Sequence, residues 1–541
     1  MNSRVLVIAI ALLGGGLAAP QSPPLVFDVR AHGAKGDGRS ADTVAINAAI
    51  DAAAAAGGGV VAFPAGRYLT FSIRLRSHIT LQFAPGAVLV AGDPSIDGGR
   101  YDAPEPNPSD LYQDFGHSHW QNSLIWGVDV EDIAIVGPGL IDGRGLTRRG
   151  PGARWARPGG DRPLSMGAAV GGAADPEAGQ RSMDGQGNKA IALKRARNVT
   201  LRDFAILNGG HFALLATGVD TLTIDNVRVD TNRDGFDIDA SRNVRISNVA
   251  INSPNDDALV LKSSYALGEA RPTENVTITN VQVSGFDIGT VLDGTRKHTQ
   301  ERAPDRDGVT GRIKLGTESN GGFRNITISN CVFEWSRGLA LETVDGGVLE
   351  DVTVTNVTMR HVTTAPIFLR LGNRARAPEG TPVAALRRVT ISNIVASDVE
   401  SHYAAIVAGV PEHPVEDVLL SNIRLQFRGG GTEADANAEV AEHAEAYPEP
   451  SMFGTTPSYG LYVRHARNIT VRDFDVQSIS PDGRPPVALV DVDGFYSDHL
   501  TAARAAGSPF LALENVRQLV VRGTPGLPDL ILPRVAGREL R

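Results

Sequence analysis

The chain has 541 residues, among them 60 glycines, 32 prolines and one cysteine, Cys331. One cysteine excludes an intrachain disulfide framework. The 52 basic and 61 acidic residues give a net charge of -9, so no basic surplus points to a nucleic-acid partner. With 42% hydrophobic and 21% charged residues, general disorder is also excluded.

Residues 1–19 contain one cation, Arg4, followed by an apolar run over residues 5–19 with small residues near its end. This pattern predicts a cleaved secretory signal peptide. The run is shorter than the ~20 residues that a membrane-spanning helix needs, and no later segment reaches that length. We therefore expect a secreted or periplasmic protein with no membrane partner.

Residues 40–56 are alanine-rich and amphipathic, with Ser40 or Asp42 as the candidate N-cap and Gly57 as the stop. This segment predicts a helix, which we expect to cap the N-terminal end of the fold. Residues 57–68 then predict the first strand and its bend.

A short phrase of the type Asn-Val-Thr-Ile-Thr-Asn recurs from residue 198 onward. Each copy alternates apolar and polar residues and is rich in Val, Ile and Thr, which is typical of a strand with one buried face. The closest copies start between 22 and 26 residues apart, with no helical pattern between them. Short strands at this period predict a right-handed parallel β-helix, an all-β solenoid whose coils stack around an apolar interior.

An asparagine ends most copies at the same place, where stacked side chains can hydrogen-bond from coil to coil. The residues are Asn226, Asn248, Asn280, Asn330, Asn356, Asn393 and Asn422. We expect one β-helix domain over residues 25–535, with loop insertions around 142–188, 284–311 and 426–458.

Aspartates gather in two segments of this repeat. Residues 231–239 read Thr-Asn-Arg-Asp-Gly-Phe-Asp-Ile-Asp, and residues 255–262 read Asn-Asp-Asp-Ala-Leu-Val-Leu-Lys. Because stacked parallel strands lie ~4.8 Å apart, Asp234, Asp256 and Asp257 should crowd one patch of the outer surface. Their repulsion should keep one carboxyl protonated while another stays ionised, which is the acid and base pair that glycoside hydrolysis needs.

Other interpretations of this patch stay open. Asp237 and Asp239, taken alone, are typical of a solvated acidic face. Three aspartates can also bind Ca²⁺, although the EF-hand spacing is absent. Asn232 and Lys262 lie beside the aspartates as candidate substrate-binding donors.

These motifs resemble glycoside hydrolase family 28, the polygalacturonase family of β-helix pectin hydrolases, which includes rhamnogalacturonan hydrolases. Residues 232–237 are similar to its Asn-Thr-Asp-Gly-[Phe/Ile/Val]-Asp motif, residues 255–257 to its [Gly/Gln]-Asp-Asp segment, and residues 27–38 to its opening. The resemblance covers roughly residues 25–480, by the spacing of these motifs.

The resemblance implies a role for each aspartate. Asp256 would be the general acid, and Asp234 and Asp257 would hold and activate a water molecule. The reaction would invert the anomeric carbon without a metal ion or other cofactor. Such a mechanism needs ~6.5–9.5 Å between acid and base, which neighbouring coils should supply.

Two motifs of the family do not match. Residues 309–312 read Val-Thr-Gly-Arg, so the family histidine before residues 316–322 is missing. The family's Arg-Ile-Lys, whose cations bind the galacturonate carboxylate, is replaced by a segment that ends in Glu342. Arg312 and Lys314 form an Arg-Ile-Lys one coil too early; they should face outward, either as replacement substrate-binding cations or as solvated ones.

The sequence thus predicts a secreted, inverting glycoside hydrolase that cleaves galacturonosyl linkages of pectic polysaccharide, exo-acting on rhamnogalacturonan-type oligomers. The cationic segment 295–302 could wall off one end of a cleft. Its His298 is either a replacement for the missing histidine or, more simply, a surface residue. The alternatives are β-elimination like that of a pectate lyase and a non-catalytic polysaccharide-binding β-helix. We expect a monomer whose partner is its substrate.

Overall fold

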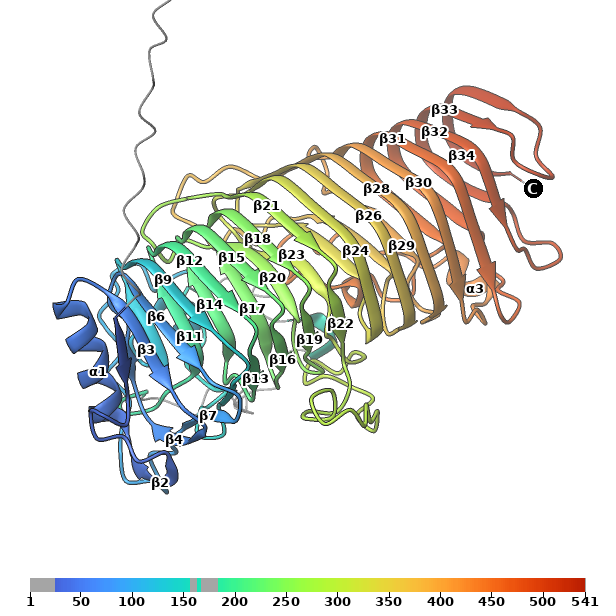
Figure 1. The fold of residues 1–541 in the computed structure, drawn as a ribbon. Coiled ribbons are helices and arrows are strands. Elements are labelled where there is room, and N and C mark those ends of the chain that lie inside the picture. Colours follow the sequence, from blue (N-terminus) through green and yellow to red (C-terminus); the bar gives the residue numbers. More distant parts are fainter. Residues whose placement is uncertain (1–24, 156–162, 167–182, 541) are drawn as a thin grey trace, which may run out of the picture.

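The computed structural model describes residues 25–155, 163–166 and 183–540, so the expected signal peptide at residues 1–19 lies outside the described residues. The chain winds into a right-handed parallel β-helix whose 34 strands are linked into one continuous sheet (Figure 1). Three parallel faces run along the solenoid, and the strands pair with strands one coil away, except for the antiparallel last strand. Within the described ranges, no helix is long and apolar enough to cross a membrane.

The short strands of the N-terminal coils belong to one face each. The first face contains β1 (Val26–Asp28), β3 (Gly59–Phe63), β6 (Ile79–Phe83), β9 (Glu131–Val136), β12 (Arg197–Arg202), β15 (Asp220–Asp225), β18 (Arg242–Ser247) and β21 (Thr273–Thr279). The second contains β2 (Asp37–Ala41), β4 (Gly66–Thr70), β7 (Ala87–Ala91), β10 (Leu140–Asp142), β13 (Ala205–Leu207), β16 (Arg228–Asp230), β19 (Ala250–Asn252) and β22 (Gln282–Ser284).

The third face carries the aspartate motifs. It contains β5 (Ile73–Arg74), β8 (Ile125–Val128), β11 (Lys189–Lys194), β14 (Phe212–Thr217), β17 (Asp234–Asp239), β20 (Leu259–Ser263), β23 (Ile313–Ser319), β25 (Leu339–Thr343), β27 (Ile367–Leu371) and β29 (Ala405–Ala408).

The strands of the C-terminal coils are longer, because they bend from one face onto the next without a break. They are β24 (Phe323–Ser336), β26 (Val348–Val362), β28 (Ala385–Val399), β30 (Val415–Phe427), β31 (Leu461–Ser478), β32 (Val487–Ala502) and β33 (Leu511–Arg522).

The expected asparagine ladder is confirmed. Asn330, Asn356 and Asn393 occupy the bend with left-handed φ angles of 56°, 56° and 55°, a conformation that asparagine tolerates better than most residues. The Nδ2 of Asn356 donates to Oδ1 of Asn330 over 3.1 Å, and the Nδ2 of Asn393 donates to Oδ1 of Asn356 over 3.1 Å. The ladder thus ties each bend to the one before it.

Both ends of the solenoid are covered. The helix α1 (Thr43–Ala55) packs Ile46 and Ile50 into the core, as its sequence predicts. Two strands, β1 and β2, precede it, so the first strand begins earlier than the expected 57–68 segment. At the C-terminal end, β34 (Leu530–Leu540) turns back antiparallel to β33.

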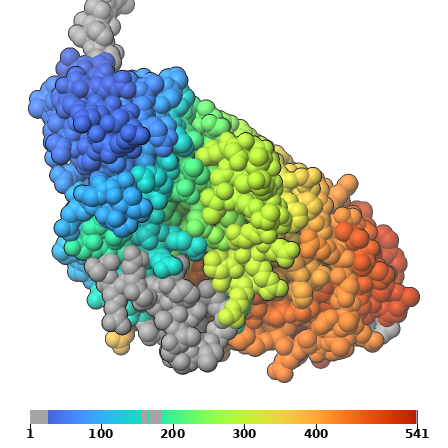
Figure 2. All heavy atoms as spheres, turned by 90° about the horizontal axis from the view of Figure 1, so that it is seen from below, coloured from blue at the N-terminus to red at the C-terminus, as the bar shows by residue number. Residues whose placement is uncertain are grey.

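Loops leave the coil at four places that position the site. The expected insertions lie between β10 and β11 (residues 143–188, with η1, Leu164–Met166), between β22 and β23 (loop 285–312) and between β30 and β31 (loop 428–460). The last carries α3 (Glu433–Ala436) and η2 (Pro450–Phe453). A fourth, loop 92–124, carries α2 (Phe115–Ser118) and is not expected from the sequence. Loop 285–312 stands out as a yellow-green ridge beside the orange C-terminal coils in Figure 2.

Candidate active site

The three predicted aspartates come from two successive coils. Asp234 is the first residue of β17, and Asp256 and Asp257 lie in the turn just before β20. The backbone N–H of Gly235 donates to the carbonyl of Asp257 over 3.0 Å, which fixes the two coils against each other. One carboxylate oxygen from each aspartate lies within 4.8 Å of the others, so the structure brings all three together.

Asp257 is held in its ionised form. Its side chain is buried, and the Nε of Arg312 donates to its Oδ1 over 2.7 Å while the Nζ of Lys314 lies 3.7 Å from Oδ2. Burial alone raises the pKa of the Asp257 carboxyl, but these two cations outweigh burial and lower it below its usual value. Asp257 is therefore available as a proton acceptor.

Asp234 has the opposite tendency. Burial and the nearby charge of Asp256 raise the pKa of the Asp234 carboxyl well above its usual value, although Lys262 opposes the shift. Two of the three carboxyls are thus pushed in opposite directions by their surroundings. This is the unequal sharing of protons that the sequence predicts for this patch.

Asp256 is the most exposed of the three, with a side-chain exposure of 33%. The Nε of Arg233 lies 3.3 Å from its Oδ2, and the Nη2 of Arg233 lies 3.8 Å from Asp114. Arg233 takes the place of the threonine in the family motif, so this chain places a cation directly beside the predicted acid.

The carboxylates of the three aspartates lie close together. One oxygen each of Asp234, Asp256 and Asp257 lies within 4.8 Å of the others, whereas the ~6.5–9.5 Å expected for inversion is the separation of the acid and base carboxyl groups as a whole. The cause is local geometry, since two of the residues are neighbours in sequence and the third is one coil away, ~4.8 Å along the axis.

Arg312 and Lys314 do not behave as solvated cations. They alternate with core residues, so they leave the coil on its outer side, yet each is only 1% exposed. Loop 428–460 covers them, and its Glu449 accepts from Nη2 and Nη1 of Arg312 over 2.6 and 3.1 Å. The sequence could not show this cover, because nothing in loop 428–460 repeats with the coil.

A second anion, Glu342, lies beneath the same cover. It is fully buried with an oxygen 3.3 Å from Nζ of Lys314, and burial raises the pKa of its carboxyl to about 7. Arg337 adds a third cation, 3.2 Å from Glu449 and 2.6 Å from Asp305. The predicted cation site is therefore a closed ion-pair cluster.

Lys262 is buried and faces two carboxylates, with Nζ 3.1 Å from Oδ2 of Asp237 and 3.2 Å from Oε2 of Glu318. The solvated-face interpretation of Asp237 and Asp239 is wrong, because both are fully buried. Asp239 accepts from the backbone and hydroxyl of Ser264 over 2.7 and 2.6 Å. These two buried aspartates thus fix the positions of Lys262 and Ser264 in the site.

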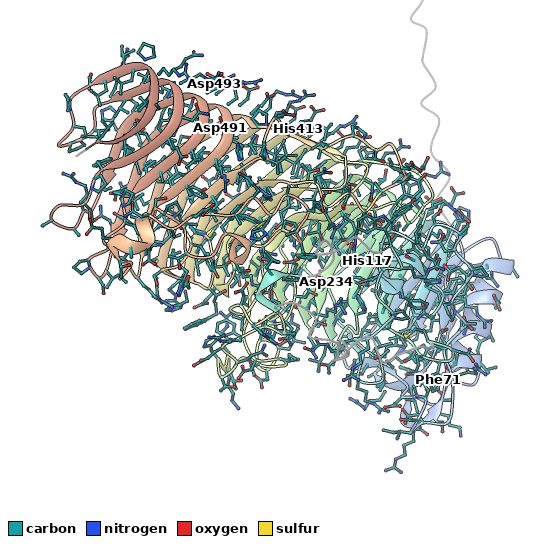
Figure 3. All side chains as sticks on the ribbon, turned by 180° about the vertical axis from the view of Figure 1, so that it is seen from behind. Phe71, His117, Asp234, His413, Asp491 and Asp493 are labelled. Atoms are coloured by element: carbon teal, nitrogen blue, oxygen red, sulfur yellow. The ribbon has the colours of Figure 1, made fainter. Side chains whose placement is uncertain are left out.

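The sequence interpretation missed His117. It lies in α2 with its Nδ1 2.7 Å from Asp114 and its Nε2 3.0 Å from Asp237, and Lys262 also contacts Nε2. His117 and Asp234 lie near each other midway along the solenoid (Figure 3). Burial lowers the pKa of His117, but Asp114 and Asp237 outweigh it and raise that pKa to about 10. An Asp-x-x-His pair in a non-repeating segment was the one available signal.

A second buried histidine, His211, adjoins the same cluster. Its Nε2 lies 3.4 Å from Asp114, and burial lowers its pKa to about 3, so the ring is neutral. By contrast, His298 stacks on Trp335 with ring centroids 3.7 Å apart, and Trp335 stacks on His361 at 4.1 Å. His298 thus fastens loop 285–312 to the coil.

Asn232 belongs to a polar rim around the aspartates. Its Oδ1 accepts from Nη1 of Arg148 over 3.2 Å and from Nδ2 of Asn255. Gln300 of loop 285–312 donates in turn to Asn255, so this predicted wall does reach the site. The rim joins three separate segments of the chain.

Among the described residues, three groups of side chains have the composition of a metal site, and two of them belong to this site: Asp234 with Asp256 and Asp257, and Asp114 with His117 and His211. The first group already faces Arg312, Lys314 and Arg233, and the second faces Lys262. These cations supply positive charge that a metal ion would otherwise bring.

Parts of the chain match two family models. Residues 112–300 match the model of glycosyl hydrolases family 28, and residues 26–93 match a model described as rhamnogalacturonase A/epimerase, pectate lyase-like. A "Probable polygalacturonase" of Vitis vinifera is 23% identical over 450 residues, which covers 79% of this chain and 80% of the relative.

Two solved structures share the fold. The exopolygalacturonase of Thermotoga maritima has a TM-score of 0.59 and 17% identity, with 97% of each chain covered. The family 28 exopolygalacturonase of Yersinia enterocolitica has a TM-score of 0.55 and 18% identity, with 92% of this chain and 79% of that chain covered. The family 28 match and the polygalacturonase relatives identify a glycoside hydrolase, and the three converging aspartates agree with that class. Within the class, it is the family 28 model that matches residues 112–300 of the chain.

Proposed function

We propose that the enzyme hydrolyses galacturonosyl linkages of pectic polysaccharide, acting from the chain end on oligomers of the rhamnogalacturonan type. The observation that carries this proposal is the convergence of Asp234, Asp256 and Asp257, with the pKa of Asp234 raised and that of Asp257 lowered. The polygalacturonase relatives support the substrate class. The apolar run at residues 5–19 supports export.

In the proposed reaction the proton that the raised pKa of Asp234 retains in this patch moves to the neighbouring Asp256. Asp256 donates it to the glycosidic oxygen as the bond from that oxygen to the anomeric carbon breaks. A water molecule between Asp234 and Asp257 attacks the anomeric carbon and forms the new C–O bond. Its proton passes to Asp257, which Arg312 keeps ionised beforehand. To restore the starting state, Asp257 releases that proton and Asp256, which is partly open to solvent, regains one.

Two loops that pack over the third face, one on either side of the aspartates, support action at a chain end. On the C-terminal side of Asp257, Met452 and Phe453 of loop 428–460 pack on outward-facing Phe368 and Ile406 of the third face. On the N-terminal side, Trp120 of loop 92–124 packs on β11 and β14. A polymer lying along the solenoid would meet a cover on either side of the aspartates, whereas a chain end needs only the space between them.

The test is incubation with polygalacturonan and rhamnogalacturonan oligomers, with chromatographic identification of the first product. We expect a small product from the first minutes, with solution viscosity falling slowly as reducing ends accumulate. Asp256→Asn should lower the rate by ~10²–10⁴-fold. Asp51→Asn, on the exposed face of α1, is the matched control and should keep full activity. A fully active Asp256→Asn variant would refute the mechanism and favour a non-catalytic role.

A further inference from the structure

We propose that Glu449 is a specificity-determining residue, which makes the position beside Asp257 a subsite for an uncharged sugar and excludes a uronate there. This inference rests on the proposed hydrolase function and adds the charge preference of each side of the site. The Arg312–Lys314–Arg337 cluster would otherwise be a receptor for a sugar carboxylate.

Glu449 itself occupies the position of such a carboxylate. Its two oxygens lie 2.6 and 3.1 Å from two nitrogens of Arg312, which is the bidentate geometry that an arginine offers to any carboxylate ligand. The same side chain lies 3.2 Å from Arg337 and 3.9 Å from Lys314. Glu449 is only 3% exposed, so the chain supplies this anion permanently from loop 428–460.

The cluster is fully compensated by the chain's own carboxylates. Its three cations contact four acidic side chains within 4 Å, namely Asp257, Glu449, Glu342 and Asp305. A uronate arriving next to Asp257 would meet further negative charge without gaining a new cation partner from this cluster. Juxtaposed like charges at a contact disfavour the wrong ligand strongly.

The opposite side of the site has a different charge. Arg233 is 16% exposed and lies 3.3 Å from Asp256, and Arg148 donates to Asn232 on the same rim. These guanidinium groups are less buried than Arg312 and Lys314 and lie beside the predicted acid. A uronate carboxylate is therefore favoured on the Arg233 side and an uncharged sugar on the Glu449 side.

An aromatic ring accompanies Glu449. Tyr447 is only partly buried, and its ring centroid lies 5.3 Å from Nζ of Lys314. Aromatic rings pack well against the C–H faces of uncharged sugars. A backbone that alternates acidic and uncharged sugars fits both sides of the site, whereas a backbone of uronates alone fits one.

The experiment compares kcat/KM on two size-matched oligomers, an oligogalacturonide and an oligomer that alternates galacturonate with an uncharged sugar. The wild-type enzyme should prefer the alternating oligomer. Glu449→Gln keeps the shape of the side chain and removes its charge, so it should shift the preference toward the oligogalacturonide by roughly tenfold. Glu416→Gln, which removes a carboxylate from the exposed Arg467 on the neighbouring strand, is the matched control and should leave the preference unchanged.

Each outcome has a distinct meaning. Equal wild-type rates on both oligomers, or an unchanged preference in Glu449→Gln, would overturn this inference and leave the hydrolase function standing. Cleavage of neither oligomer would overturn the hydrolase function as well. If Glu449→Gln does not fold by circular dichroism, the wild-type preference alone decides, because it needs no variant.

Discussion

The Nε of Arg312 donates to Oδ1 of Asp257 over 2.7 Å, across 55 residues of sequence that the coil brings into contact. The contact sets the protonation state of the predicted base from the neighbouring coil. It also links the base to Glu449, which shares the same guanidinium group.

The first prediction concerns the acidic limb of the pH–rate profile. Asp257 must be ionised to accept a proton, so activity falls as the pH drops through its pKa. Arg312 lowers that pKa. Arg312→Gln should therefore raise it and move the acidic limb of kcat/KM upward by about one pH unit. Arg312→Lys keeps the charge and should leave the limb much closer to that of the wild type. If the acidic limb of the Arg312→Gln profile stayed where it is in the wild type, Asp257 would not be the base.

The second prediction concerns stereochemistry. The resemblance implies inversion, although the carboxylate oxygens lie within 4.8 Å of one another. We expect the first-formed product to carry the inverted anomeric configuration, measured by proton NMR before mutarotation. Retention would instead indicate a covalent intermediate on one aspartate, for which a separation of ~5–5.5 Å is typical.

The third prediction separates hydrolysis from calcium-dependent elimination. Arg312 and Lys314 already compensate Asp257, so chelation of divalent cations should leave the rate unchanged. The product should show no ultraviolet absorbance from an unsaturated uronate. Loss of activity on chelation with recovery on adding Ca²⁺, or an absorbing product, would favour the lyase alternative.

The fourth prediction concerns His117. Its pKa of about 10 exceeds the ordinary value of 6.5, so its contribution to stability is fully present below pH 6.5 and is lost as the pH rises to about 10. His117→Asn removes this cation from Asp114 and Asp237. It should lower the free energy of unfolding by about 3–5 kcal/mol and should also lower kcat. Chemical denaturation at several pH values measures the loss of stability, and steady-state kinetics measures kcat.

The control for His117 is His499→Gln. His499 also pairs with an aspartate, Asp498, at 3.1 Å, but it is an exposed residue of β32 near the C-terminal end of the solenoid. This variant should keep kcat. If both variants lowered kcat equally, His117 would have only a general structural role.

The fifth prediction concerns the close approach of two coils at Gly235. A Cβ there would lie 2.2 Å from the carbonyl oxygen of Ala258 and 2.5 Å from a methyl carbon of Ile251. Gly235→Ala should lower the free energy of unfolding by about 1–3 kcal/mol and displace Asp234. Gly152→Ala, where no atom lies within 4 Å, should change stability little. Thermal unfolding of both variants provides the comparison.

The fold and the convergence of the aspartates could both be predicted, for the same physical reason. A strand pattern that repeats with the coil places residues 22 or so apart side by side, and Asp234, Asp256 and Asp257 follow that pattern. The repeat also predicted the asparagine ladder, because its positions recur at every bend.

The surroundings of the aspartates could not be predicted in this way. His117 and Glu449 reach the site from loops 92–124 and 428–460, whose paths follow no period. The same loops bury Asp237 and Lys314, which the alternation of the strands correctly turns outward but cannot show to be covered. The period of the repeat determines whether a side chain points into or out of the coil, whereas its solvent exposure depends on the loops that cover it.

The asparagine ladder also makes the stacking of the coils independent of the loops that leave them. Ladder partners are 26 residues apart at Asn356, 32 at Asn280 and 37 at Asn393, yet the hydrogen bonds are 3.1, 3.2 and 3.1 Å long. Each hydrogen bond of the ladder therefore depends on where the chain re-enters the bend and not on the length of the loop that precedes it. Loops of very different length can therefore replace one another while the stacking of the coils is preserved. This gives the β-helix a direct route to new sugar preferences.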